Sequence, residues 1–209
     1  MNKAISILFV LLLAGGCFFE PREAEQGTGG QTEVCSSPSS PDVMPQELID
    51  ALQTIVWDRF SCLYTEDFVF IPDAADVVDL TENGIAVPEP WGVDEEFTAF
   101  NFISACHKGT TRQAGVIELV LDDIDILPDD DLSLEEFTAK YTLTILSLAV
   151  ETGVLGEFVY EGVWEITTVE TDEGWKIAEW VDLQTGGENP TWGFFKGQVN
   201  GGVDFCDPR

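Results

Sequence analysis

Alternating apolar and polar positions dominate the second half of the chain. The stretches 116–126, 137–145, 157–169 and 175–183 place apolar side chains at every second position, which is the period of a β-strand with one buried face. A turn-type sequence at 171–174 separates the last two stretches. A capping-box pattern at 133–136 favours a helix, but the β-branched residues that follow favour a strand. We therefore expect four antiparallel strands after residue 110.

Helical spacing dominates the first half of the chain. Apolar residues recur every three or four positions over 45–63, and Pro45 and Glu47 suit the first turn of a helix. A second helix is expected over 95–107, where aromatic residues cover more than one face. A short strand at 67–72 ends at Pro72. Two helices followed by an antiparallel sheet predict an α+β fold.

The N-terminus has the features of an export signal. Lys3 precedes an apolar run at 4–14, which is shorter than the roughly 20 residues that a membrane-spanning helix needs. Gly15 and Gly16 then precede Cys17, and this arrangement resembles a bacterial lipoprotein signal, although Ala14 stands where leucine is usual. The resemblance implies a signal peptide at 1–16 and acylation of Cys17, which would anchor the protein to a membrane of the cell envelope, on its periplasmic or outer side. An ordinary secretory signal with an unmodified Cys17 is the alternative.

Residues 17–41 are expected to form a flexible acylated tether, because they are rich in glycine, serine and proline and contain little to bury. The folded domain is then expected at 42–209. Its four remaining cysteines, an even number in an exported chain, predict two disulfides with three possible pairings. We favour pairing Cys62 with Cys106 and Cys35 with Cys206, because the second bond would join chain ends that are often neighbours.

The charge of the chain limits its partners. With 39 acidic against 9 basic residues, the formal charge is −30, so the chain repels nucleic acid and anionic headgroups. We therefore expect no nucleic-acid partner, and membrane contact through the lipid on Cys17 only. Hydrophobic residues make up 44% of the chain, which is enough to build a core and argues against intrinsic disorder.

Two segments carry a family resemblance. Residues 162–166 with 172–182 look like the closing hairpin of the nuclear transport factor 2-like, or SnoaL-like, superfamily, and 60–70 look like its first helix running into its first strand. The resemblance implies a curved antiparallel sheet wrapped around a long helix, a cystatin-like roll with a conical pocket. Members include isomerases, dehydratases, cyclases, epoxide hydrolases and non-catalytic binding proteins. None of their catalytic sets transfers: Pro72 holds the position of the isomerase base, and the lone histidine, His107, is explained by its place at a helix end.

Glu179 is the candidate catalytic residue. Strict alternation along the last strand places it among the apolar residues of one face, in a pocket walled by Phe70, Tyr160 and Trp164. Poor hydration there would raise the pKa of Glu179 toward the range of a general acid or base. Three alternatives remain: a β-bulge turns Glu179 outward, Glu179 lies at the open rim of the pocket, or the faces are inverted and Trp180 and Asp182 line the pocket.

No cofactor or metal is expected from the sequence. The acidic run at 122–131 does not fit the register of an EF-hand calcium loop, and no glycine-rich phosphate loop is present. We therefore expect a non-catalytic envelope lipoprotein that binds a small apolar ligand or a protein partner. The alternatives are an acid–base enzyme that uses Glu179 on a hydrophobic substrate, in the manner of isomerases or cyclases, and a purely structural role in the envelope.

Overall fold

The computed structural model describes residues 37–108, 112–128, 134–149 and 154–203. The helices and strands follow in this order: η1 (Pro41–Val43), α2 (Met44–Thr54), α3 (Trp57–Ser61), β1 (Tyr64–Ile71), α4 (Ala74–Glu82), α5 (Val93–Lys108), β2 (Arg112–Pro128), β3 (Leu134–Ala149), β4 (Val154–Thr171), β5 (Gly174–Leu183) and α6 (Trp192–Asn200). Among the described residues, no helix has the length and apolar character needed to cross a membrane.

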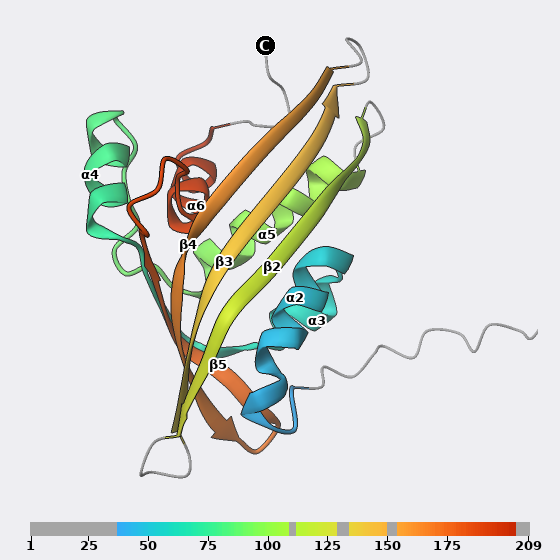
Figure 1. Ribbon diagram of the computed structural model, residues 1–209, viewed down its shortest axis with the longest axis vertical. Helices are drawn as coiled ribbons and strands as arrows, with labels where there is room; N and C mark the ends of the chain where they lie inside the picture. Colours follow the sequence, from blue (N-terminus) through green and yellow to red (C-terminus); the bar gives the residue numbers. More distant parts are fainter. Residues whose placement is uncertain (1–36, 109–111, 129–133, 150–153, 204–209) are drawn as a thin grey trace, which may run out of the picture. The chain divides into compact units, whose positions relative to one another are not determined.

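The strands form one curved, five-stranded sheet in the order β1-β5-β4-β3-β2 (Figure 1). The pairs β5–β4, β4–β3 and β3–β2 are antiparallel, whereas β1 pairs with β5 in parallel. The predicted α+β class and the curved sheet are confirmed. The expectation of a purely antiparallel sheet is wrong, because the short early strand β1 joins the edge beside β5 and runs in the same direction.

The predicted first helix is two helices. Ile55 adopts a left-handed conformation with φ of 52°, and Val56 is extended, so α2 ends and α3 begins after a break. The apolar spacing continues across this break, which explains why the sequence predicts one helix. After the break, the ring of Phe60 stacks on that of Phe100 of α5, with 4.1 Å between the ring centroids.

The core lies between the inner face of the sheet and α2, α3 and α5. The residues that the strands contribute to it are large, and they alternate along the strands as the sequence predicts, except across an irregularity in β5. They include Phe68 and Phe70 of β1, Ile117 and Leu119 of β2, Phe137, Tyr141 and Leu143 of β3, Tyr160, Trp164 and Ile166 of β4, and Trp175, Ile177 and Trp180 of β5.

Helices α4 and α6 were not predicted. Helix α6 packs against α5, α4 and β4 and lies beside β4 in Figure 1. The hydroxyl of Thr191 caps its N-terminus by accepting a hydrogen bond from the amide of Phe194, at 3.2 Å. Trp192, Phe195 and Val199 of α6 are buried. The C-terminal segment therefore completes the core of the domain.

The described part of the domain begins before the predicted boundary at residue 42. The hydroxyl of Ser37 donates a hydrogen bond to the carbonyl of Cys62 at 3.1 Å, and the amide of Trp175 donates to the carbonyl of Pro38 at 2.8 Å. Ser37 and Pro38, which belong to the predicted tether by composition, are thus hydrogen-bonded to the end of α3 and to β5. Glycine and proline content alone does not separate a free linker from a docked one.

Candidate functional site

A buried polar cluster lies where α6 meets the end of β5. Asp182 of β5 accepts hydrogen bonds from the hydroxyl of Tyr141, at 2.9 Å, and from the amide of Gly193. The amide of Trp192 donates to the same Tyr141 hydroxyl at 2.6 Å. Free amides at a helix N-terminus favour an anionic partner. Asp182 and Tyr141 therefore hold the first turn of α6 against the sheet.

Asp182 has an unusual ionisation. Burial raises its pKa from 3.8 to about 7, although the charge of Lys196 and the hydrogen bonds from Gly193 and Tyr141 favour the carboxylate. Burial also raises the pKa of Tyr141 well above its usual value of 10.0. A carboxyl group with a pKa near neutrality can both give and accept a proton at physiological pH, so Asp182 has the ionisation that the sequence analysis assigned to Glu179.

Lys196 of α6 and Glu96 of α5 form an ion pair inside the domain. The distance from Lys196 Nζ to Glu96 Oε2 is 2.6 Å, and both side chains have an exposed fraction of 0%. Burial lowers the pKa of Lys196 to about 8, while the charges of Glu96 and Asp182 oppose this shift. Within the described residues this is a fully dehydrated pair, held in place by two helices that pack against each other.

Aromatic rings surround this pair, and they include predicted ligand-binding residues. The ring of Trp180 lies 6.0 Å from that of Phe70 and 4.6 Å from that of Trp164, while Tyr160 contacts Phe195 of α6 at 5.1 Å between centroids. The structure buries Phe70, Tyr160 and Trp164 together with Trp180 and Asp182, the pair that was expected there only if the faces of the last strand were inverted. The side chains of Lys196 and Phe195 lie among them, so α6 fills this part of the interior with the chain's own residues.

The predicted position of Glu179 is wrong. The pairing of β4 with β5 shifts between Thr167, opposite Glu179, and Thr168, opposite Ile177. This leaves Ala178 as the extra residue of a β-bulge, which reverses the facing of the residues that follow. Glu179 is therefore exposed, while Trp180 and Asp182 point inward. The bulge was one of the alternatives left open by the sequence, which contains no glycine at this point to mark it.

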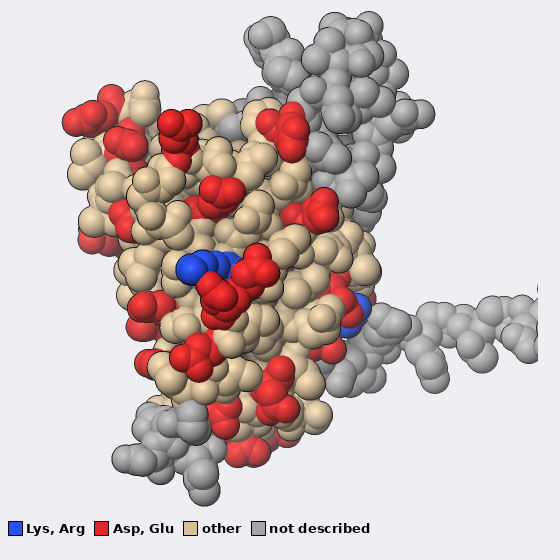
Figure 2. Space-filling model, viewed as in Figure 1, with Lys and Arg blue, Asp and Glu red and all other residues tan. Residues whose placement is uncertain are grey.

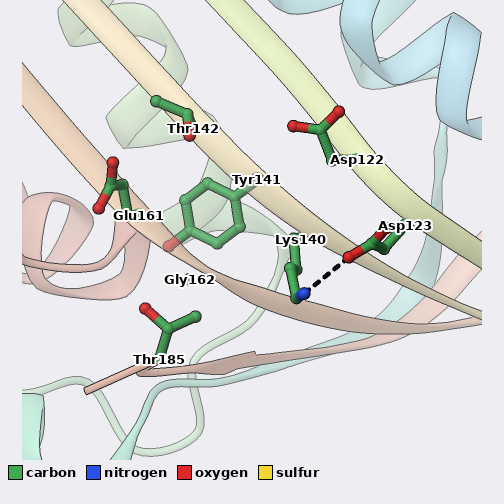
Figure 3. A pocket seen from close by; sticks show the side chains of 8 residues that line it. All are labelled: Asp122, Asp123, Lys140, Tyr141, Thr142, Glu161, Gly162 and Thr185. Carbon is green, nitrogen blue, oxygen red and sulfur yellow. Dashed lines mark hydrogen bonds and ion pairs between the residues drawn. The ribbon is translucent and has the colours of Figure 1, made fainter. Parts of the chain in front are cut away.

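A second feature is an open pocket lined by residues of β2, β3 and β4 and by Thr185, which follows β5. Its volume is about 530 Å³, and it is lined by Asp122, Asp123, Lys140, Tyr141, Thr142, Glu161, Gly162 and Thr185 (Figure 3). Lys140 forms an ion pair with Asp123 at 2.6 Å between Nζ and Oδ2. Figure 2 shows that acidic side chains outnumber basic ones over this view of the domain. The lining of the pocket itself contains three acidic side chains and one basic side chain.

Gly162 links the pocket to the buried cluster. A Cβ atom at this position would lie 2.7 Å from the ring and the hydroxyl of Tyr141, so the absence of a side chain leaves room for the Tyr141 ring against β4. The same hydroxyl is bonded to Asp182. Gly162, Tyr141 and Asp182 therefore connect the open pocket with a carboxyl group that is itself fully buried.

Tyr141, Glu96 and Lys196 were not predicted as site residues. Trp192, Phe195 and Val199 recur at helical spacing behind Thr191, a typical N-cap, and this signal could have revealed α6. Nothing in the sequence indicates that Lys196 points inward, because lysine is almost always exposed. The contact between Lys196 and Glu96 joins residues that are far apart in the chain.

Several predicted residues lie outside the described part of the structure. These are Cys17, Cys35 and Cys206, and the side chain of Cys106 is also not described. Cys62 is buried at the end of α3, with an exposed fraction of 2%. Both disulfide pairings and the lipid attachment therefore stay predictions.

No protein-family model and no curated protein matches the chain. Solved structures do match it. A protein from Kribbella flavida aligns with a TM-score of 0.51 and 12% identity, over 73% of this chain and 91% of that chain. The β subunit of the benzoate 1,2-dioxygenase of Burkholderia mallei aligns with a TM-score of 0.50 and 13% identity, over 68% and 85%.

These two alignments show that the chain shares its fold with both structures. A protein with a cystatin-like fold from Caulobacter vibrioides also aligns, with a TM-score of 0.43 and 12% identity, over 68% of this chain and 84% of that chain. At these identities the likeness shows the fold and not the activity. The curved sheet and the α+β class agree with the resemblance to nuclear transport factor 2-like proteins, and membership of that superfamily stays a prediction.

Proposed function

We propose that the chain is a cell-envelope lipoprotein, anchored through Cys17, whose cystatin-like domain binds a ligand or a protein partner without catalysing a reaction. The observation that carries this proposal is the position of Lys196. Its side chain and that of Phe195 lie among the aromatic residues that the sequence analysis assigned to an apolar ligand. Because the chain itself fills this space, binding is assigned to the open pocket lined by residues of β2, β3 and β4.

The volume of that pocket and the charges of its lining indicate the kind of molecule that it binds. Its volume of about 530 Å³ lies within the range of small-molecule sites. Polar and charged residues make up most of the lining, and the carboxylates of Asp122 and Glu161 are not paired with Lys140, whose partner is Asp123. We therefore replace the apolar ligand with a hydrogen-bonding ligand, or a polar surface of a partner protein, that carries positive charge.

Blocking the pocket tests this assignment. Thr142 lines the pocket, and Thr144 stands two residues further along β3 on the same face but is not part of the lining. Full-length protein is purified with Thr142→Trp or with Thr144→Trp as the matched control, and bound material is identified by native mass spectrometry. Material that stays with the wild type and with Thr144→Trp but is lost from Thr142→Trp supports the proposal. Equal binding by all three proteins rejects the pocket as the site.

The lipid anchor needs a separate test. Cys17→Ser removes the sulfur that would carry the lipid, so we expect the variant to leave the membrane fraction while the domain stays folded. Intact mass spectrometry of the wild type should show cleavage before Cys17 and an added diacylglyceryl group. An unmodified Cys17 in the mature protein, or a membrane fraction that is unchanged in the variant, would reject the anchor.

An acid–base enzyme is the second candidate, with Asp182 in place of Glu179. The observation that favours it is the hydrogen bond between Asp182, whose pKa is about 7, and Tyr141, which lines the pocket. Isomerisation of hydrophobic β,γ-unsaturated ketones, followed by the absorbance of the conjugated product, is a direct assay. Turnover by the wild type that Asp182→Asn abolishes would establish this function. A rate equal to the background for both proteins would reject it for this class of substrate.

A further inference from the structure

The ammonium group of Lys196 lies inside a cage of aromatic rings. Its Nζ atom is 3.1 Å from the ring centroid of Phe70, 4.7 Å from that of Trp180, 5.6 Å from that of Trp192 and 5.9 Å from that of Trp91. A cation within about 6 Å of a ring centroid is attracted by the ring, and cages of this kind bind ammonium ligands. The cage therefore has the construction of an ammonium-recognition site.

Carboxyl groups complete the cage. Glu96 Oε2 accepts a hydrogen bond from Lys196 at 2.6 Å, and Glu96 Oε1 is buried without a hydrogen-bond partner among the described residues. Asp182 lies close enough for its charge to act on Lys196. A buried carboxylate with a free acceptor is costly to maintain for stability alone, whereas it suits a site whose ligand brings several N–H donors.

The ammonium group in the cage belongs to a residue of helix α6. The connection from β5 to α6 is exposed over residues 184–189, and α6 contributes Lys196 as the one cation described in the cage. The group that fills the site therefore belongs to a helix joined to the sheet by an exposed segment. In this respect Lys196 resembles a ligand attached to the protein by a linker.

We propose that the cage is a binding site for primary alkylammonium groups, which Lys196 occupies as a tethered ligand and for which a free primary alkylammonium competes. A primary ammonium fits better than a quaternary one, because Nζ donates to Glu96 and lies 3.1 Å from the Phe70 centroid, where methyl groups would collide with the ring. This site is distinct from the open pocket of the proposed function, and neither proposal depends on the other.

The test removes the tethered ligand and supplies a free one. Lys196→Ala deletes three methylene groups and the ammonium, which together correspond to n-propylammonium. Binding to the full-length protein is followed by tryptophan fluorescence and by the thermal midpoint, with 1-propanol and tetramethylammonium as comparison ligands. We expect saturable binding of n-propylammonium to Lys196→Ala with a Kd at least tenfold below that of the wild type, and weaker binding of both comparison ligands.

Other outcomes overturn the proposal. Equal affinity of wild type and variant for n-propylammonium would show general attraction to an acidic surface. Equal affinity of the variant for n-propylammonium and 1-propanol would show an apolar cavity without ammonium recognition, and absence of binding by a folded variant would exclude the site.

A variant that does not fold still gives an answer. Lys196→Ala is then refolded with n-propylammonium or 1-propanol, and recovery of native circular dichroism with the amine alone supports the site, whereas failure with both rejects it. Lys196→Met fills the space with a neutral chain of similar length, so we expect it to bind n-propylammonium no better than the wild type. Binding as tight as that of Lys196→Ala would contradict competition for the same space.

Discussion

Replacing Asp182 with asparagine should change how the stability of the domain depends on pH. Burial raises the pKa of Asp182 from 3.8 in the unfolded chain to about 7 in the folded one. The folded state therefore binds this proton more tightly, and the stabilisation is complete below pH 3.8 and is lost as the pH rises through about 7. The shift corresponds to about 4 kcal/mol in the free energy of unfolding.

The variant removes this pH dependence. Asparagine cannot ionise, but its amide nitrogen meets either the Gly193 amide or the Tyr141 hydroxyl, where the carboxylate accepted hydrogen bonds. That mismatch costs about 1–3 kcal/mol, and it is the same at every pH, so it lowers the whole curve without changing its slope. From pH 4 to pH 7.5 the stability of Asp182→Asn should therefore rise relative to the wild type by about 4 kcal/mol.

Guanidinium denaturation followed by tryptophan fluorescence, at half-unit steps between pH 4 and pH 7.5, measures this difference. The upper limit avoids the titration of Lys196, whose pKa of about 8 changes stability in the opposite direction at higher pH. Asp125→Asn, at an exposed position on β2, is the matched control and should run parallel to the wild type. A difference between Asp182→Asn and wild type that does not vary with pH would refute the buried, proton-binding state of Asp182.

The ion pair between Lys196 and Glu96 and the close packing around Gly162 give further predictions. Glu96→Gln and Lys196→Met should each destabilise the domain by about 3–5 kcal/mol, because each leaves a buried charge unpaired. The double variant should cost much less than their sum, as measured by denaturant unfolding, and simple additivity would contradict direct pairing. Gly162→Ala should lower stability by about 1–3 kcal/mol, because its Cβ atom would lie 2.7 Å from the carbonyl oxygen of Leu183. Gly187→Ala, whose nearest contact is 3.6 Å, should change stability by less than about 0.5 kcal/mol.

Most strands of the fold could be predicted from the sequence, because the alternation of apolar and polar residues that marks a strand is a local pattern. The alternation in 157–169 and 175–183 depends only on one face of the sheet being buried, and β4 and β5 cover those residues. Helix α5 was also found, since its aromatic residues and the glycine after it mark its position. The sheet order was not predictable from pattern, because the parallel pairing of β1 with β5 joins segments far apart in the chain.

The residues of the candidate site were predicted in part. Each error in that prediction can be traced to a particular residue. Trp164 and Tyr160 were found because they occupy alternating positions on β4, before any irregularity. Glu179 was misplaced because one extra residue in β5 reverses every later side chain. Lys196 was missed because its burial depends on the carboxyl group of Glu96 and on the rings around it, and no spacing along the chain reports that contact.

The most direct test of this account is the proton NMR spectrum of the ε-methylene group of Lys196 in the full-length protein at pH 6. Our central claim is that this side chain fills the interior of the roll, with its ammonium 3.1 Å from the Phe70 centroid. We predict resonances shifted far upfield by the aromatic rings, with nuclear Overhauser contacts to the Phe70 ring, and these signals should be absent from Lys196→Met. Resonances at the position of a solvent-exposed lysine, without contacts to aromatic protons, would contradict the account.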